Sequence, residues 1–120
     1  MARIVGIEHV QLAMPAGEES AARQFYSDQL GLVEVLKPQH LAVRGGCWFE
    51  APGVKLHLGV EAAFSPARKA HPALLVDDLA AFVSGLKIHG VDVVPDDPAE
   101  GRARCYVSDP FGNRIELMQA

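Results

Sequence analysis

The sequence of this chain repeats itself, and the repeat constrains the fold more than any other feature. Each half predicts one strand, one helix and then three strands. Both expected helices carry apolar residues at the 3.6-residue period, so each buries one face. The repeat predicts an α+β fold of two βαβββ modules, in which a helix covers one face of each sheet and leaves the other bare. The expected strands are 7–14, 32–36, 47–51 and 54–60 around a helix at 18–31, then 71–76, 91–95, 103–109 and 113–119 around a helix at 78–90.

Length and composition predict a single domain. The chain has 120 residues, 49% of them hydrophobic, which is enough to fill one core. We expect module one at about 4–61 and module two at about 71–120. The segment between them, about 62–70, has no hydrophobic periodicity and contains Pro66, so we interpret it as a linker within the domain.

Charge and cysteine content exclude several classes of function. The formal net charge of −4 gives no basic face for nucleic acid. No apolar run approaches the roughly 20 residues of a membrane span, and the N-terminus lacks the pattern of a signal peptide. We therefore expect a cytoplasmic protein with neither a nucleic-acid nor a membrane partner. Cys47 and Cys105 have no CxxC spacing and lie in apolar, strand-like surroundings, which predicts reduced, buried thiols.

Glycine and aspartate mark the ends of the expected elements. Gly31 and Gly90 are the last residues of the two expected helices and predict their C-terminal ends. The segments 44–46 (RGG), 51–53 (APG) and 109–113 (DPFGN) combine turn-forming residues and predict hairpin turns between strands.

A histidine lies in the middle of the apolar strand VKLHLGV at 54–60. Side chains alternate between the faces of a strand, so Leu56 and Leu58 lie on one face and His57 on the other. The same alternation, applied to the first and last strands of each half, assigns these residues to the bare faces: His9, Gln11, His57, His71, Ala73, Arg114, Glu116 and Met118.

Four of these residues are metal-ligand types at repeat-related positions. His9 and His57 come from the first and last strands of the first half, and His71 and Glu116 from those of the second. If those strands are neighbours, the Cβ atoms of each pair lie about 5 Å apart, which suits joint ligation of an ion. Two pairs that face each other would make a four-ligand site for one divalent metal ion, and imidazole with carboxylate suits Zn, Ni, Mn or Fe.

Several stretches together resemble the vicinal oxygen chelate superfamily, which includes glyoxalase I, bleomycin-resistance proteins and extradiol dioxygenases. These stretches are EHVQLAM, AARQFYSDQLGLVEV, HPALLVDDLAAF and YVSDPFGNRIEL. The resemblance covers nearly the whole chain. It implies the glyoxalase-like fold, with strand order 1-4-3-2 in each module, a cupped mixed sheet and a divalent metal ion inside the cup.

The resemblance also implies roles for individual residues. His9, His71 and Glu116 match the three recurrent metal ligands of the superfamily, and His57 stands where glyoxalase I-like members place a glutamate. Glu116 would then be the only carboxylate ligand and the catalytic base. Two-module members commonly build each cup from two chains, which implies a homodimer.

The reaction stays open at this point. The resemblance favours a glyoxalase-like metalloenzyme that chelates vicinal oxygens of a small-molecule substrate, with lyase, isomerase or transferase-type chemistry. One alternative is an Fe(II) ring-cleaving dioxygenase, and another is a non-catalytic drug- or metabolite-binding resistance protein. Basic side chains could reach an anionic substrate, and aromatic ones could form an apolar pocket wall: Arg68, Lys69, Arg102 and Arg104, and Trp48, Phe49 and Tyr106.

Overall fold

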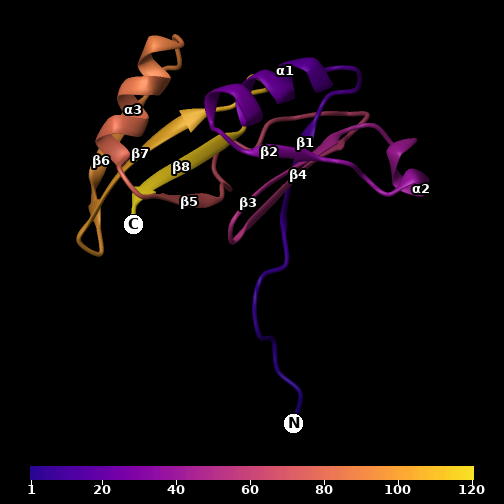
Figure 1. Cartoon of the computed structure of the whole chain (residues 1–120), viewed down its shortest axis with the longest axis horizontal. Coiled ribbons are helices and arrows are strands. Elements are labelled where there is room, and N and C mark those ends of the chain that lie inside the picture. The colour runs from indigo at the N-terminus through magenta and orange to yellow at the C-terminus, as the bar shows by residue number, and fades with distance from the viewer.

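Two four-stranded mixed sheets form the framework of the computed structural model, which describes all 120 residues (Figure 1). The strand orders are β1-β4-β3-β2 and β5-β8-β7-β6, so the order 1-4-3-2 implied by the resemblance is confirmed in both halves. In each sheet the first and last strands of the half pair in parallel, and the other neighbours are antiparallel. The strands are β1 (Val10–Met14), β2 (Val33–Val35), β3 (Cys47–Ala51) and β4 (Val54–Val60), then β5 (Ala73–Val76), β6 (Val94–Ala99), β7 (Arg102–Ser108) and β8 (Arg114–Gln119).

The helices begin and end near the predicted residues. The first predicted helix forms as α1 (Glu19–Arg23) followed by a π-helical segment, η1 (Gln24–Gln29). The second forms as α3 (Leu79–Ile88), where the Asp78 side chain accepts a hydrogen bond from the Ala81 backbone at 3.0 Å. A one-turn helix, α2 (Gln39–Ala42), was not predicted, because four residues are too few to show a helical period. None of these helices is long and apolar enough to cross a membrane.

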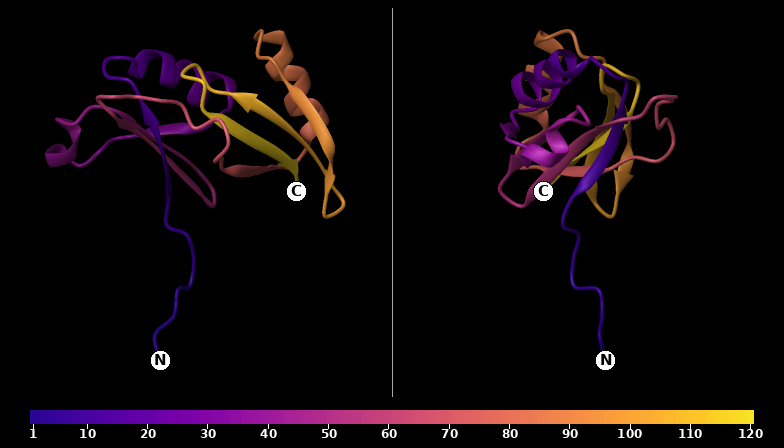
Figure 2. Two further views of the ribbon diagram at one scale, coloured as in Figure 1. Left: turned by 180° about the vertical axis from the view of Figure 1, so that it is seen from behind. Right: turned by 90° about the vertical axis from the view of Figure 1, so that its right-hand side faces the viewer.

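Both long helical segments lie on the same side of the two sheets. Figures 1 and 2 show α1 and α3 above the sheets, and no helix on the opposite side, toward which the N-terminal segment extends. The buried core lies between helices and sheets and includes Phe25, Leu56, Leu58, Leu86 and Ile115. The prediction that each sheet keeps one helix-free face is therefore confirmed.

Some predicted boundaries were wrong. β1 begins at Val10 and β5 at Ala73, so His9 and His71 each lie just before their strand. The pairing of β1 with β4 starts only at Val10, opposite Leu56, and Pro72, just before β5, lacks the N–H that a ladder needs. β6 begins three residues later than predicted, at Val94. The segment 44–46 connects α2 to β3 and is not a hairpin turn.

The turn 109–113 joins β7 to β8, as predicted, and also locks the two halves together. The Asp109 carboxylate, 4% exposed, accepts a hydrogen bond of 2.6 Å from the Tyr26 hydroxyl of η1. The Asn113 side chain donates to the Asp109 carboxylate and to the Ala13 carbonyl of β1, and accepts from the Ala67 amide of the linker. Burial and the adjacent Asp109 raise the pKa of Tyr26 far above its usual value, so the phenol stays a donor. We call this set of contacts the inter-half lock.

Both cysteines are free and buried, which confirms the prediction for Cys47 and Cys105. Burial raises the pKa of the Cys47 thiol to about 11. Burial also raises the pKa of the Cys105 thiol above its usual value. Neither thiol is therefore ionised at neutral pH.

Gly46 packs against the backbone of β4 so closely that no other residue fits. Its φ is +80°, and a Cβ there would meet the Leu58 carbonyl oxygen at 2.1 Å. We expect Gly46→Ala to lower the free energy of unfolding by about 3 kcal/mol or more, because backbone strain adds to a clash that a strand cannot relieve. Gly53→Ala is the matched control: its φ is +75° but no atom lies within 4 Å of the added carbon. Gly53→Ala should lower the free energy of unfolding by only about 1–2 kcal/mol, because backbone strain is its one unfavourable effect. Equal urea midpoints for the two variants would contradict this assignment.

Candidate metal-binding site

His71 and Glu116 form a contact pair on the helix-free side of the second sheet. The His71 Nε2 atom lies 2.9 Å from the Glu116 Oε1 atom. β5 and β8 are paired in parallel with Ala73 opposite Glu116, which places the residue before β5 against this carboxylate. Glu116 is 7% exposed, so its carboxylate is largely removed from water. The predicted convergence of this pair is confirmed.

The hydrogen bonds of His71 favour a cation between the two side chains. The His71 Nδ1 atom lies 2.8 Å from the Lys69 carbonyl oxygen, which can only accept, so Nδ1 carries a proton. In a neutral imidazole, Nε2 then presents a lone pair to the Glu116 carboxylate, and two lone pairs facing each other require a proton or a metal ion between them. A ring N–H donated to a backbone carbonyl is also the usual arrangement of a metal-ligating histidine.

Arg104 of β7 contacts the other carboxylate oxygen of Glu116 and is itself hydrogen-bonded to Tyr106. The Arg104 guanidinium lies 3.5 Å from Glu116 Oε2 and 3.1 Å from the Asp96 carboxylate of β6, and it donates to the Tyr106 hydroxyl at 2.6 Å. The Tyr106 ring meets the His71 ring edge to face, with centroids 5.4 Å apart. Glu116 therefore has one oxygen directed to His71 and one fixed by Arg104.

His57 lies in a stack of three aromatic rings on the helix-free side of the first sheet. Its ring is parallel to Trp48 of β3, with centroids 4.0 Å apart, and lies 4.3 Å from the ring of His9. Trp48 and His57 are register partners, and Gln11, two residues after His9, is the partner of His57 on the other side. The strand pairing therefore produces the stack, and the stack fixes the plane of the His57 ring.

His57 is neutral and free to bind a ligand. It is 5% exposed, and burial, with a smaller contribution from His9, lowers the pKa of its imidazole. Neither nitrogen of His57 forms a hydrogen bond within the chain. A metal ion binds the neutral imidazole, so both properties fit a ligand role.

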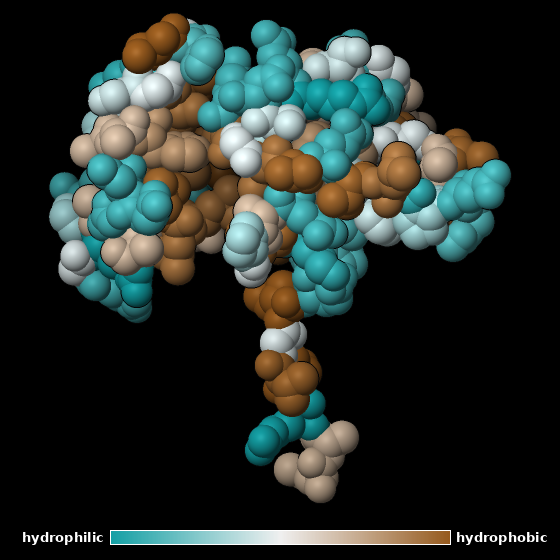
Figure 3. All heavy atoms as spheres, viewed as in Figure 1, coloured by the Kyte–Doolittle hydropathy of each residue, from teal (hydrophilic) through white to brown (hydrophobic).

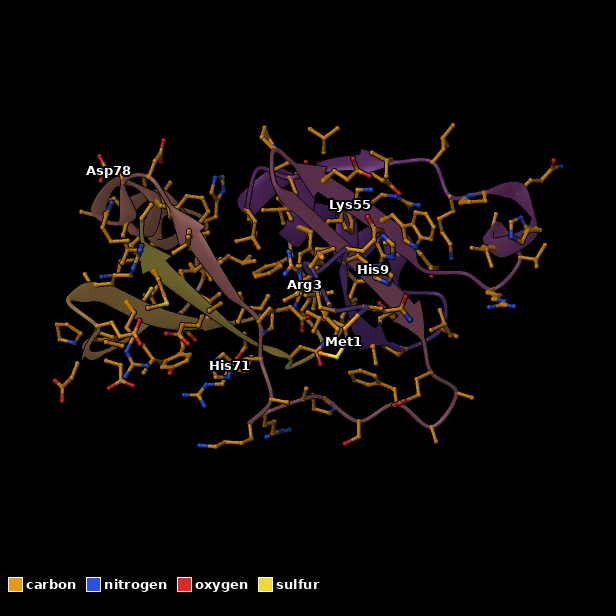
Figure 4. All side chains as sticks on the ribbon, turned by 90° about the horizontal axis from the view of Figure 1, so that it is seen from below. Met1, Arg3, His9, Lys55, His71 and Asp78 are labelled. Atoms are coloured by element: carbon orange, nitrogen blue, oxygen red, sulfur yellow. The ribbon has the colours of Figure 1, made fainter.

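The two pairs lie over different sheets. Figure 4 shows His9 over the first sheet and His71 beside the second, apart from each other. Within one chain, no group of three or more His, Cys, Asp or Glu side chains is arranged to hold a metal ion. The four predicted ligands therefore lie as two separate pairs, and a single chain does not bring the two pairs together.

The other predicted residues divide between the site and its surroundings. Trp48 and Tyr106 lie beside the two pairs, whereas Phe49 is fully buried in the core and cannot line a pocket. Arg104 contacts Glu116, and Arg102 instead donates to the Gln119 carbonyl. The partnership of Arg104, Tyr106 and Glu116 was missed. The alternation of β7 indicates it, because residues 104 and 106 lie on one face of the strand. Their register partners on β8 are residues 118 and 116, on the same face of the sheet.

Comparison with known proteins identifies the family. The profile of the Glyoxalase/Bleomycin resistance protein/Dioxygenase superfamily matches residues 6–117. The chain therefore belongs to this superfamily, as the resemblance in the sequence indicated. A comparison with curated proteins found no match.

Solved structures similar to this chain include a glyoxalase family protein, an antibiotic binding protein and a fosfomycin resistance protein. A glyoxalase family protein from Bacillus anthracis is 46% identical, with 99% of this chain and 98% of that chain covered and a TM-score of 0.96. TnmS3, an antibiotic binding protein from Streptomyces sp. CB03234, is 25% identical over 97% and 98% of the two chains, with a TM-score of 0.70. FosX, a fosfomycin resistance protein from Listeria monocytogenes, is 16% identical over 98% and 95%, with a TM-score of 0.75, and shows the fold alone.

Proposed function

We propose that this protein is a divalent-metal-dependent enzyme acting on a small substrate with vicinal oxygens, and that two copies of the chain build each site. One copy supplies His9 and His57, and the other supplies His71 and Glu116. The observation that carries the proposal is the His71 and Glu116 contact, in which a ring nitrogen and a carboxylate oxygen face each other at 2.9 Å while the other ring nitrogen donates to a carbonyl. This arrangement matches half of a metal site.

Exposed apolar residues support a second copy. Ile4, Val5 and Ile7 of the N-terminal segment are almost fully exposed, and Leu75 of β5 is 61% exposed. Figure 3 shows hydrophobic spheres along the N-terminal segment, which extends on the helix-free side of the sheets. Apolar surface of this kind marks an interaction site, and the segment leads directly into His9. A second copy on that side would bring its own pair of ligands to the site.

The side chains divide the chemistry between them. A divalent ion held by the three imidazoles and Glu116 would polarise two neighbouring substrate oxygens and stabilise developing negative charge on them. Glu116 is the only carboxylate in this set, and we assign proton transfer to it. Arg104 orients the Glu116 carboxylate, and Trp48 and the Tyr106 ring provide flat walls for the substrate.

Metal content tests the ligand set. Protein purified without a chelator or affinity tag should carry near-stoichiometric transition metal, and His9→Ala and Glu116→Ala should each lose most of it, because each removes one of the four ligands. His40→Ala, which removes an exposed histidine of α2, is the matched control and should keep its metal. Equal metal content in all four proteins would overturn the assignment.

Metal binding to this protein can also be followed by tryptophan fluorescence. Trp48 is the only tryptophan, and its ring stacks on His57 at 4.0 Å. Co²⁺ added to metal-free protein should therefore quench tryptophan fluorescence, and His57→Ala should abolish saturable quenching. Fe(II) as the native metal would favour ring-cleaving oxygen chemistry, whereas Zn, Ni or Mn would favour lyase, isomerase or transferase chemistry.

A binding protein without catalysis is the second candidate. The stack of Trp48, His57 and His9 offers a flat aromatic surface to a planar ligand, and the relative TnmS3 is an antibiotic binding protein. Tight binding of a drug or metabolite by metal-free protein would favour this candidate, if α-keto thiohemiacetals, catechols and thiol-acceptor epoxides show no turnover with any of the four metals.

A further inference from the structure

A cavity of about 830 Å³ is lined by residues of α1 and η1, of the segment after α3, of the start of β6 and of the end of β7. Figure 1 shows how α1, α3, β6 and β7 are arranged. The lining of the cavity is polar on several sides and includes Gln24 and Gln29 of the helical segment and Ser108 of β7. Two arginines, Arg68 and Arg114, line it as well. The proposed function uses none of these residues.

The backbone holds the two arginines beside the same cavity. The Arg114 amide donates to the Ala67 carbonyl at 2.8 Å, and the Ala67 amide donates to the Asn113 side chain at 3.0 Å. These two bonds fix the linker against the start of β8, so that Arg68, the next residue, lies at the rim of the cavity that Arg114 lines.

Both guanidinium groups lack a counter-charge. No carboxylate lies within 4.0 Å of either one, whereas Arg104 on the neighbouring strand has both Asp96 and Glu116 as partners. Asp92 is the only carboxylate among the lining residues and pairs with neither arginine. In a chain of net charge −4, this cavity concentrates unpaired positive charge, which attracts an anion.

Arg114 is also positioned for planar recognition. Its guanidinium carbon lies 3.7 Å from the centroid of the Tyr106 ring. Stacking of this kind covers the face of the guanidinium and leaves its N–H groups free at the edge, where they can donate two parallel hydrogen bonds to a carboxylate or phosphoryl group.

Tyr106 connects this cavity with the candidate metal ligands. The ring that Arg114 covers also contacts His71, and Tyr106 is the register partner of Glu116. Arg114 and Glu116 are two residues apart on β8, which places them about 7 Å apart along the strand on the same face. Glu116 does not line the cavity itself, so a ligand held at Arg114 would have to extend over this distance, past Tyr106, to reach it.

We propose that the ligand of this protein carries an oxyanion, a carboxylate or phosphoryl group, which Arg114 and Arg68 bind at one end while its vicinal oxygens lie at Glu116. The substrate class is thus a short oxygenated acid. The placement of the vicinal oxygens rests on the proposed function, but the oxyanion site does not, because none of its residues is a metal ligand.

Binding to metal-free protein tests the oxyanion site separately. The probe is 2-oxoglutarate, which has vicinal oxygens at one end and a carboxylate at the other, with its dimethyl ester as the uncharged counterpart and inorganic phosphate as the anion alone. Calorimetry should give saturable binding of 2-oxoglutarate that weakens at least about tenfold in Arg114→Gln and also weakens in Arg68→Gln, as expected for a lost charge-assisted hydrogen bond. The ester should bind weakly and equally to all variants. Phosphate binding that is lost in Arg114→Gln would identify a phosphoryl group as an accepted oxyanion.

Arg44→Gln is the matched control, because it removes the same charge from an exposed position outside the lining of the cavity. It should change the dissociation constant less than about twofold. Equal affinity for 2-oxoglutarate in wild type and Arg114→Gln, with both folded by circular dichroism, would overturn the proposal, as would the absence of saturable binding to wild type. If anion binding behaves as expected and metal has no effect on it, the oxyanion site stands and the proposed metal function fails.

Discussion

Asp109→Ala is expected to lower the free energy of unfolding by about 3–5 kcal/mol, a large part of the stability of a domain of this size. Four hydrogen bonds end on this carboxylate: from the Tyr26 hydroxyl, the Asn113 side chain, and the backbone amides of Phe111 and Asn113. The substitution leaves these donors without an acceptor. A buried donor without an acceptor lowers the free energy of unfolding by more than a typical satisfied hydrogen bond contributes to it. Urea unfolding followed by circular dichroism gives the measurement.

Two further variants separate the contributions to the inter-half lock. Tyr26→Phe removes one donor and leaves the turn intact, so it should cost about 1–2 kcal/mol. Asp28→Ala removes an exposed carboxylate of η1 and should change stability by less than about 0.5 kcal/mol. If Asp109→Ala were no more destabilising than Asp28→Ala, the lock would contribute nothing to stability.

Mixing two variants that each bind little metal should restore metal binding. His57→Ala and Glu116→Gln should each bind little metal alone. If each site combines His9 and His57 of one copy with His71 and Glu116 of the other, a mixed dimer contains one site with both substitutions and one site with neither. After unfolding and refolding together at equal amounts, about half the dimers are mixed, so about a quarter of all sites should be intact. Metal content and Trp48 fluorescence give independent measurements.

The result distinguishes a shared site from a site within one chain. A site built within one chain would stay defective in every mixture, and restoration would be absent. A mixture of His57→Ala with His9→Ala is the control, because both substitutions lie in the same half and no combination yields an intact site. A stable monomer in sedimentation at micromolar concentration, with metal still bound, would also contradict the shared site.

The sequence predicted much of the fold because its repeat and its alternation are both periodic signals. The strands VKLHLGV and CWFEA form with the predicted bounds, and the buried Leu56 and Leu58 face away from His57 as expected. The π-helical segment could not be predicted, because the buried Phe25 and Tyr26 fit the apolar stripe of an ordinary α-helix. The boundary of β1 depends on which neighbour pairs with it, which a single sequence does not reveal.

The sequence predicted the two pairs of the candidate site but not the side chains that surround them. Alternation identified His57 and Glu116 without any knowledge of neighbours. The stack on Trp48 and the contact of Arg104 with Glu116 depend on strand register, which shifts every contact when it changes by one residue. The separation of the two pairs depends on how the halves are joined, and no local pattern encodes that.

The inter-half lock also decides whether the two halves are interchangeable. Its phenol comes only from the first half, because α3 contains no tyrosine, and its acceptor only from the second, because the β3–β4 turn contains no carboxylate. A tandem of two first halves would bury a phenol with no acceptor, and a tandem of two second halves would bury a carboxylate with no phenol. Although the halves share one architecture, each has become a dedicated partner for the other, and neither can be duplicated to replace its neighbour.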